Sequence, residues 1–288
     1  GQRMTHLPPP TGPPSPYITC LATDAQGHLL VGTATHGLHR FRAGHWEQVW
    51  SADAPQAQQV YDVATLGHGA LLIAAADGLH LLQGNKRTSY LRGRVIQDLV
   101  VTTDTVWCAT DKGLYAGVVA DSLELQLVGG IPMVSYNALA QDSKGNLWLG
   151  TTAHGLVRKR GTRTKTYGRD AGLQSLAIEC VVLDALENIW LGTKQGIHLV
   201  ELDALQEQVL SIRAFGPEDG FIGLESLPGA ALLDTDSSLW FGTVRGAIRY
   251  DARQVVNDPK EPLVHFTDLR LFYERPDWSP WCAGFSTN

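Results

Sequence analysis

The sequence contains little of what metal sites, redox sites and helical folds are built from. It has four cysteines (Cys20, Cys108, Cys180 and Cys282), none in a Cys-x-x-Cys pair or at a metal-like spacing from a histidine. It has two methionines, against 30 glycines and eight tryptophans, a composition that favours short strands joined by tight turns over helices. We therefore expect an all-β fold with free thiols, no metal and no cofactor.

The chain also lacks an excess of positive charge, with 23 lysines and arginines against 29 aspartates and glutamates and a formal net charge of -6. Binding nucleic acid in general needs a basic excess that neutralises phosphates, so we expect no nucleic-acid partner. No stretch approaches the roughly 20 apolar residues that span a bilayer, and the N-terminus has no basic-then-apolar signal segment. We expect contact with a membrane only through segments outside this sequence.

What the sequence does contain is an internal repeat, clearest at residues 142–158 (DSKGNLWLGTTAHGLVR). Six copies align on an apolar core that ends in Gly-Thr or a variant of it: 29–33, 71–75, 106–110, 147–151, 189–193 and 239–243. The last residues of these cores are 42, 35, 41, 42 and 50 positions apart. This spacing brackets the period of about 40 to 45 residues that is typical of a propeller blade.

Each copy predicts a unit of antiparallel strands around that core, which is the second strand. An alternating first strand precedes it, at 18–23, 60–65, 96–101, 136–141, 178–183 and, more weakly, 229–233. A third strand follows the loop glycine in five copies, at 38–41, 79–82, 156–159, 197–200 and 247–250. A fourth is indicated at 45–50, 86–91, 123–128, 165–167 and 209–215.

We therefore predict a β-propeller of four-stranded antiparallel blades, with six repeats visible in a six- or seven-bladed ring. The propeller is expected at residues 17–258, after an N-terminal strand and proline-rich connector at 1–16 and before a truncated β-sandwich domain at 259–288. The sixth copy has no obvious fourth strand, and residues 3–7 could supply it and close the ring. The alternative is that further blades are missing.

Three columns of the alignment predict structural roles. Asp24 and Asp142 open turns that end in glycine, which suits a type I turn better than a calcium site. Trp148 and its equivalents share their column with leucine in two copies, so we expect packing between blades rather than sugar stacking. Cys108 lies in a column of apolar residues and is expected to be buried.

The pattern DxxGxLWxGTxxGLxR, with the inter-blade phrases RDAGL (169–173) and PEDGF (217–221), resembles the two-component regulator propeller repeat family. PLVHFTDLRLF (262–272) is similar to the opening of the immunoglobulin-like domain that follows such propellers in bacterial sensors. The resemblance implies the periplasmic ectodomain of an inner-membrane receptor that binds a small ligand or oligosaccharide. It also implies a relay to a membrane-attached histidine kinase or diguanylate cyclase, a homodimer being one arrangement of the full receptor.

Candidate ligand-binding residues lie in the loops between second and third strands, which open on the same propeller face as the connections between blades. The residue before each loop glycine, with one neighbour in the fifth loop, forms a predicted rim: His36, Asp77, Lys112, His154, Lys194, Gln195 and Arg245. Cationic or titratable groups outnumber the single acid, which favours an anionic or hydroxyl-rich ligand such as an acidic oligosaccharide. The alternative is that loop tips are polar because they are solvated.

We expect a binding protein rather than an enzyme, but two alternatives to that role stay open, the first of them catalytic. In a propeller lyase or lactonase, a nucleophile and a base would have to converge from different loops. His36 and His154 belong to copies three apart, which face each other across a six-membered ring, too far apart for a dyad. A purely structural or dimerising propeller is the other alternative. The identity of the ligand, the output domain and the oligomeric state stay open.

Overall fold

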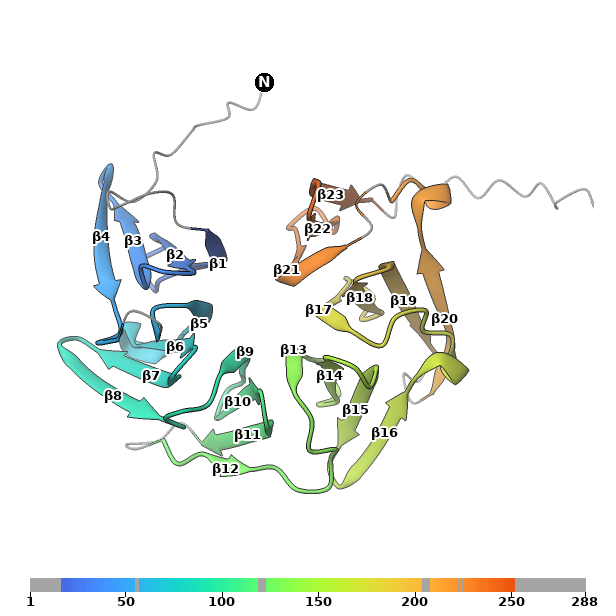
Figure 1. Ribbon diagram of the computed structural model, residues 1–288, viewed down its shortest axis with the longest axis horizontal. Helices are drawn as coiled ribbons and strands as arrows, with labels where there is room; N and C mark the ends of the chain where they lie inside the picture. The colour runs from blue at the N-terminus through green and yellow to red at the C-terminus, as the bar shows by residue number, and fades with distance from the viewer. Residues whose placement is uncertain are drawn as a thin grey trace, which may run out of the picture. The chain divides into compact units, whose positions relative to one another are not determined.

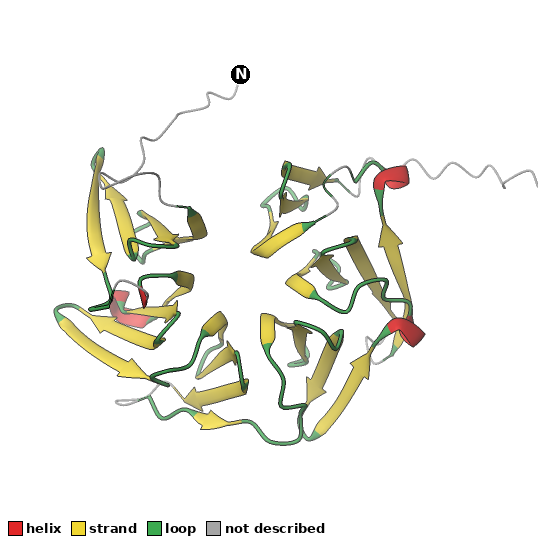
Figure 2. Cartoon of the chain, viewed as in Figure 1, coloured by secondary structure: helices red, strands yellow, loops and turns green. Residues whose placement is uncertain are grey.

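The computed structural model describes residues 17–54, 57–118, 123–203, 208–221, 223 and 225–251, all of which belong to the compact unit Gly1–Ala252. Apart from three one-turn 3-10 helices, η2 (Gly67–Gly69), η3 (Arg169–Ala171) and η4 (Pro217–Asp219), the regular structure of these residues is β (Figure 2). The strands form six antiparallel sheets that follow one another along the chain. The predicted β-propeller is confirmed.

The strands of the six blades run in chain order within each sheet (Figure 1). Blades 1 to 3 comprise β1 (Ile18–Thr23), β2 (Leu29–Thr33), β3 (Leu38–Arg42) and β4 (His45–Trp50); β5 (Val60–Thr65), β6 (Leu71–Ala75), β7 (Gly78–Gln83) and β8 (Lys86–Tyr90); and β9 (Ile96–Val101), β10 (Thr105–Thr110), β11 (Gly113–Val118) and β12 (Gln126–Leu127). Blades 4 to 6 comprise β13 (Tyr136–Gln141), β14 (Leu147–Thr151), β15 (Leu156–Arg160) and β16 (Arg163–Tyr167); β17 (Ile178–Leu183), β18 (Ile189–Thr193), β19 (Gly196–Leu202) and β20 (Val209–Phe215); and β21 (Ser226–Leu233), β22 (Leu239–Thr243) and β23 (Gly246–Tyr250).

Blade 6 has three strands within the described residues. The N-terminal strand predicted at 3–7, the connector up to residue 16, the domain boundary at 258/259, the strand at 262–272 and Cys282 all lie outside the described residues.

Several predicted strand boundaries differ from the structure, and the third strand of blade 3, β11, is missing from the prediction. The fourth strand of blade 4 begins at Arg163 rather than at residue 165, because a two-residue hairpin pairs Arg160 with Arg163. The first strand of blade 6 begins at Ser226, and a bulge between Ser226 and Ala231 hides its alternation. The fourth strand of blade 3 pairs only at Gln126–Leu127.

The glycine of the core pattern lets successive blades approach. The first strand of each blade lies innermost in Figure 1, and neighbouring first strands contact one another from β1–β5 to β17–β21. A Cβ on Gly150 would lie 2.7 Å from Cγ2 of Ile178, the first residue of β17. A Cβ on Gly32 would lie 2.9 Å from Cγ1 of Val60, the first residue of β5. Both distances are shorter than real Cβ contacts, so a side chain here would push the next blade away.

The tryptophan column packs between blades, as predicted. Trp148 and Trp190 are buried in a cluster that joins blades 4 and 5 and one that joins blades 5 and 6, respectively. Leu30 and Leu72 are buried at the same position of blades 1 and 2.

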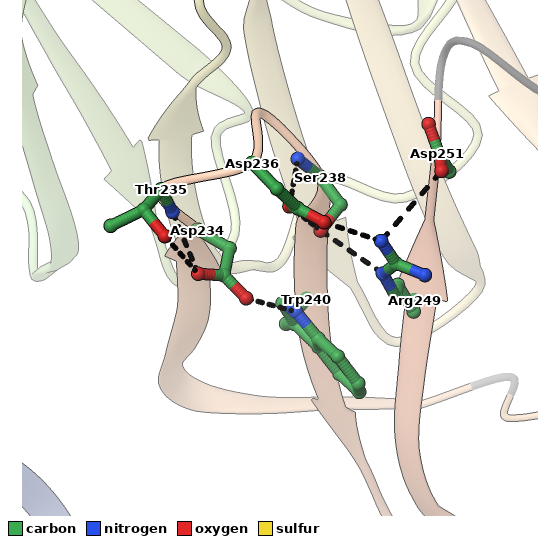
Figure 3. A network of polar contacts seen from close by, with 7 residues as sticks. All are labelled: Asp234, Thr235, Asp236, Ser238, Trp240, Arg249 and Asp251. Atoms are coloured by element: carbon green, nitrogen blue, oxygen red, sulfur yellow. Dashed lines mark hydrogen bonds and ion pairs between the residues drawn. The ribbon is translucent and has the colours of Figure 1, made fainter. Parts of the chain in front are cut away.

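The turn aspartates bind the tryptophan column as well as their own turns. In blade 4 the Asp142 carbonyl accepts the N–H of Gly145, which confirms the predicted turn, while Oδ2 accepts the indole N–H of Trp148 at 3.0 Å. Asp184 holds Trp190 in the same way. Figure 3 shows the equivalent contact between Asp234 and Trp240. In blade 3 a tighter turn at Thr102–Thr105 replaces the aspartate, and Trp107 Nε1 is buried without a hydrogen-bond partner. The aspartate is therefore what satisfies the indole.

The junction between blades 6 and 1 is packed differently from the other five. β21 contacts β1, which places blade 6 beside blade 1 in the ring. However, the three atoms nearest to a Cβ on Gly242 all belong to Ala230, in blade 6 itself. Ile18 is 59% exposed, whereas Ile178, at the same position of blade 5, is fully buried.

This difference predicts unequal effects of two matched substitutions. Ile178→Ala should lower the free energy of unfolding by about 2–5 kcal/mol, because it leaves a cavity against Gly150. Ile18→Ala should lower it by less than about 1 kcal/mol, because that side chain is largely solvated. Urea unfolding followed by tryptophan fluorescence measures both. Equal losses would contradict the open packing at Ile18.

Candidate functional site

Six of the seven predicted rim residues lie in loops with one shared anchor, the threonine that ends each second strand. In blade 4 the Thr151 hydroxyl donates to the carbonyl oxygen of Gly155 at 2.7 Å and accepts the N–H of His154 at 2.8 Å. The same two bonds recur in four other blades, at Thr33, Thr110, Thr193 and Thr243. These bonds use only the threonine hydroxyl and backbone groups. The side chain of the residue before the glycine therefore does not contribute to holding the loop in shape.

The side chains carried by these turns are mostly exposed, namely those of Lys112, His154, Lys194, Gln195 and Arg245, while His36 is half-buried. His36 Nδ1 lies 2.8 Å from the Thr35 hydroxyl, and Lys194 Nζ lies 3.9 Å from Glu179 Oε1. Burial raises the pKa of the Glu179 carboxyl, and the nearby Lys194 charge opposes that rise. These contacts stay within single blades, so the rim residues are presented separately on successive loops.

Blade 2 departs from this pattern because Ala75 replaces the threonine. Here Asp77 Oδ1 lies 2.8 Å from His80 Nε2, and His80 Nδ1 lies 3.0 Å from the Ser89 hydroxyl directly across the sheet. The His80 ring packs on Trp50 of blade 1, with ring centroids 4.8 Å apart. The network therefore ties the β6–β7 turn to β8 and to the preceding blade.

A cavity of about 470 Å³ opens beside this network, on the rim face between blades 1 and 2. Its walls carry carboxylates, guanidinium groups and hydroxyls, from Ser51, Asp53, Asp77, Arg87, Ser89 and Arg92. Volume and lining suit a small, hydroxyl-rich or zwitterionic molecule held by hydrogen bonds. Asp77 is the predicted rim residue that lies in this cavity.

A second, smaller cavity of about 180 Å³ lies at the ring centre and is lined by residues from the first strands of all six blades. Its acidic residues are Asp62 and Asp98, which the sequence analysis did not single out. Asp62 Oδ2 accepts the N–H of Leu99 at 3.1 Å, and Asp98 Oδ2 accepts the N–H of Leu139 at 2.6 Å. Each carboxyl group thus joins its own blade to the next.

Burial raises the pKa of both carboxyl groups, and the charge of Asp62 raises the pKa of Asp98 further, to well above its usual range. Cys20 and Cys180 line the same cavity as free thiols, and burial raises the pKa of each to about 12. Cys108 is also free and buried, as predicted. Thiols with such pKa values are poor nucleophiles at neutral pH.

The described part of the chain holds no group of three or more His, Cys, Asp or Glu side chains arranged for a metal ion. Within the same residues, no helix has the length and apolar character needed to cross a membrane. His36 lies between β2 and β3 of blade 1, and His154 between β14 and β15 of blade 4. These two blades lie on different sides of the ring (Figure 1).

Comparison with known proteins agrees with the repeat. Residues 129–153 match the family described as two component regulator propeller. The match covers the fourth copy of the repeat, in blade 4. No curated protein matches the sequence significantly.

Solved structures share the fold of this propeller at low sequence identity. The extracellular domain of BT3049 from B. thetaiotaomicron, described as a hybrid two component system, matches with a TM-score of 0.52, 16% identity, 85% of this chain and 40% of that one. PorZ of P. gingivalis, a surface component of the type-IX secretion system, matches with a TM-score of 0.63, 14% identity, and 81% and 38% coverage. Virginiamycin B lyase from S. aureus matches with a TM-score of 0.53 and 14% identity, and the match covers 71% of this chain and 73% of that one. The chain thus spans about 40% of the length of the first two.

The aspartates of the central cavity correlate with a change in the core of the repeat that is visible in the sequence. Copies 2 and 3 are the ones whose core has alanine in place of glycine. Asp62 lies directly opposite Ala74, and Asp98 directly opposite Ala109. Where the first strand has cysteine, in blades 1 and 5, the glycine is retained, and a Cβ on it would lie 2.3 Å from the sulfur. The first-strand position that holds cysteine or aspartate and the core position that holds glycine or alanine therefore change together.

The raised pKa of the Asp98 carboxyl predicts a pH-dependent effect of Asp98→Asn. The folded protein binds this proton more tightly than the unfolded chain, so wild-type stability falls as pH rises from about 3.9 through the raised value. Asp98→Asn removes that loss, and the free energy of unfolding of the variant minus that of wild type should increase with pH, by at most about 1.4 kcal/mol per unit.

Urea unfolding at a series of pH values measures the difference. Asp104→Asn is the matched control, because Asp104 is exposed in the turn between β9 and β10. A difference for Asp98→Asn that is flat or falls with pH would contradict the assignment.

Proposed function

We propose that this propeller is the ligand-sensing part of a bacterial signalling receptor, located in the periplasm and joined to the inner membrane through segments outside this sequence. The fold is that of a sensor-type propeller, shared with extracellular domains of two-component systems. In the receptor, binding of a small ligand or oligosaccharide would be relayed to a histidine kinase or a diguanylate cyclase. The likeness to those ectodomains supports the class of protein at the level of fold alone.

The observation that carries the proposal is that some residues of the rim loops maintain the loop while others vary between blades. In five blades a buried threonine makes the same two hydrogen bonds to its loop, while the residue before the glycine varies. It is histidine in blades 1 and 4 (His36 and His154), and it is Lys112, Gln195 and Arg245 in blades 3, 5 and 6; all of these except the half-buried His36 are exposed. A constant scaffold with a varying exposed side chain is how rigid folds present binding residues. A purely structural propeller would need only the scaffold.

The charges of the rim support an anionic or hydroxyl-rich ligand. Lys112, Lys194 and Arg245 are exposed on three different loops of the same face. Lys194 Nζ lies 3.9 Å from the carboxyl group of Glu179. Because burial raises the pKa of that carboxyl group, Glu179 offsets the positive charge of Lys194 only in part. The 470 Å³ cavity beside Asp77 adds hydroxyl and guanidinium donors on that face. An acidic oligosaccharide combines the two kinds of group that these side chains bind.

The proposal predicts the behaviour of the triple variant Lys112→Ala, Lys194→Ala and Arg245→Ala. A glycan and metabolite screen by thermal shift should raise the melting temperature of the wild-type protein with at least one compound. Calorimetry with that compound should show about tenfold or greater weakening in the triple variant, because several charge-assisted hydrogen bonds are removed.

The control is a second triple variant, Arg42→Ala, Lys86→Ala and Lys144→Ala, whose exposed cations lie on turns of the opposite face. It should bind like the wild type. Equal affinity in the rim variant, or no stabilising compound at all, would refute ligand binding at the rim.

A further inference from the structure

The outer hairpin of blade 4 concentrates positive charge in an acidic protein. Residues 158–165 read RKRGTRTK and contain five cations and no acid, in a chain with a net charge of -6. They form the end of β15, a two-residue turn and the start of β16. The turn lies on the face opposite the rim, because it joins third and fourth strands.

The strand register places four of these cations on one face of the sheet. Arg158 lies directly opposite Lys165, and Arg160 directly opposite Arg163. Directly opposite residues share a face with their Cβ atoms about 5 Å apart, and residues two apart on one strand share it at about 7 Å. The side chains therefore start from a two-by-two cluster. Like charges directly opposite one another destabilise a sheet, so this arrangement costs the fold stability.

The same position in blade 1 carries charges of opposite sign. Arg40 is the equivalent of Arg158, and the residue directly opposite it is Glu47. Arg40 Nη1 lies 2.9 Å from Glu47 Oε1, and its Nε lies 3.0 Å from Asp24 Oδ2. Blade 1 thus places an acid where blade 4 places Lys165.

Blade 6 gives a second comparison, drawn in Figure 3. Arg249 is the equivalent arginine there, and its Nη2 lies 2.6 Å from Asp236 Oδ2 and 3.7 Å from Asp251 Oδ2. In blade 4, Arg158 donates from Nε and Nη2 to the amide oxygen of Asn146, at 3.2 and 3.1 Å. At this turn Arg158 contacts a neutral amide, whereas the equivalent arginines of blades 1 and 6 lie within ion-pair distance of a carboxylate.

The cluster lines a groove rather than a flat surface. A cavity of about 500 Å³ has Arg158, Arg160, Arg163, Thr164, Lys165 and Tyr167 on one side and Gln208, just before β20 of blade 5, on the other. This volume is in the range of small-molecule sites. A groove between blades admits a soluble molecule more readily than it admits a membrane surface.

Contacts within blade 4 and with the segment before it preorganise the cations. The Arg158 guanidinium lies 5.0 Å from the centroid of the Trp148 ring, and Lys165 Nζ lies 5.0 Å from that of Tyr167. The Thr164 hydroxyl donates to the carbonyl oxygen of Gly130 at 2.8 Å and ties the hairpin to the segment before blade 4. Guanidinium groups held in place bind oxyanions with two parallel hydrogen bonds and little further loss of side-chain freedom.

We propose that the groove of blade 4 is a second binding site, which takes a soluble ligand carrying two or more phosphate or sulfate groups about 5 to 7 Å apart. The exposed Arg160, Arg163 and Lys165 contact the anionic groups, and Arg158 supports them from below. The site is independent of the rim, because it lies on other loops of the opposite face.

Calorimetry with inorganic tripolyphosphate and with sucrose octasulfate tests the site in the wild type and in the double variant Arg163→Gln and Lys165→Gln. The wild type should bind at least one probe, with an affinity that falls as salt is raised. The double variant should bind at least about tenfold more weakly. It should also fold, because the substitutions remove like-charge pairs, and urea unfolding verifies this.

Arg42→Gln with Lys86→Gln is the matched control, since these exposed cations lie on the corresponding hairpins of blades 1 and 2. Unchanged affinity in this control supports the assignment to blade 4. Equal weakening in both double variants, or no binding of either probe to the wild type, would overturn it.

Sedimentation with phosphatidylcholine vesicles containing phosphatidylglycerol tests whether the anion comes from a membrane surface. Binding to these vesicles without binding to the soluble probes would also overturn the proposal. Loss of probe binding in the rim triple variant alone would place the anion at the rim instead.

Discussion

The close approach of each blade to the next is the constraint on which the rest of this structure depends. A blade cannot bury its second strand by itself, so the first strand of the following blade must pack against it. At Gly32 and Gly150 any side chain would collide with Val60 or Ile178, and at Gly192 with Ser226. Glycine is required at these positions for contact rather than for backbone conformation, since its φ there is not positive.

Once the blades are in contact, a small set of polar groups keeps each repeat in shape. The turn aspartate binds both its own turn and the indole of the tryptophan column, and the strand-end threonine binds the loop that follows. Blade 3 shows what happens when one of these groups is absent, because Trp107 Nε1 is left without a partner in the interior. Because these few columns maintain the fold, the loops and outer hairpins are free to differ in chemistry.

The places where the copies differ are where function can be sought. Blades 2 and 3 substitute the core glycine by alanine and carry Asp62 and Asp98 at the centre of the ring. Blade 2 substitutes the threonine by Ala75 and uses the Asp77–His80–Ser89 network in its place. Blade 4 places Lys165 opposite its arginine where blade 1 places Glu47 opposite Arg40. Each departure changes charge while leaving the strands in register.

The sequence by itself determined the fold class, the repeat, most strand boundaries and the turn and packing roles of Asp142 and Trp148, because these follow from local periodicity and from comparing six copies. It also predicted which loops open on the rim. Only the tertiary structure decided which residues of different blades meet, such as the Asp98 carboxylate and the Leu139 amide, 41 residues apart. It also showed that Arg158 faces Lys165 and that Ile18 is exposed. Such facts depend on strand register and on the packing of one blade against another, and no local pattern encodes either.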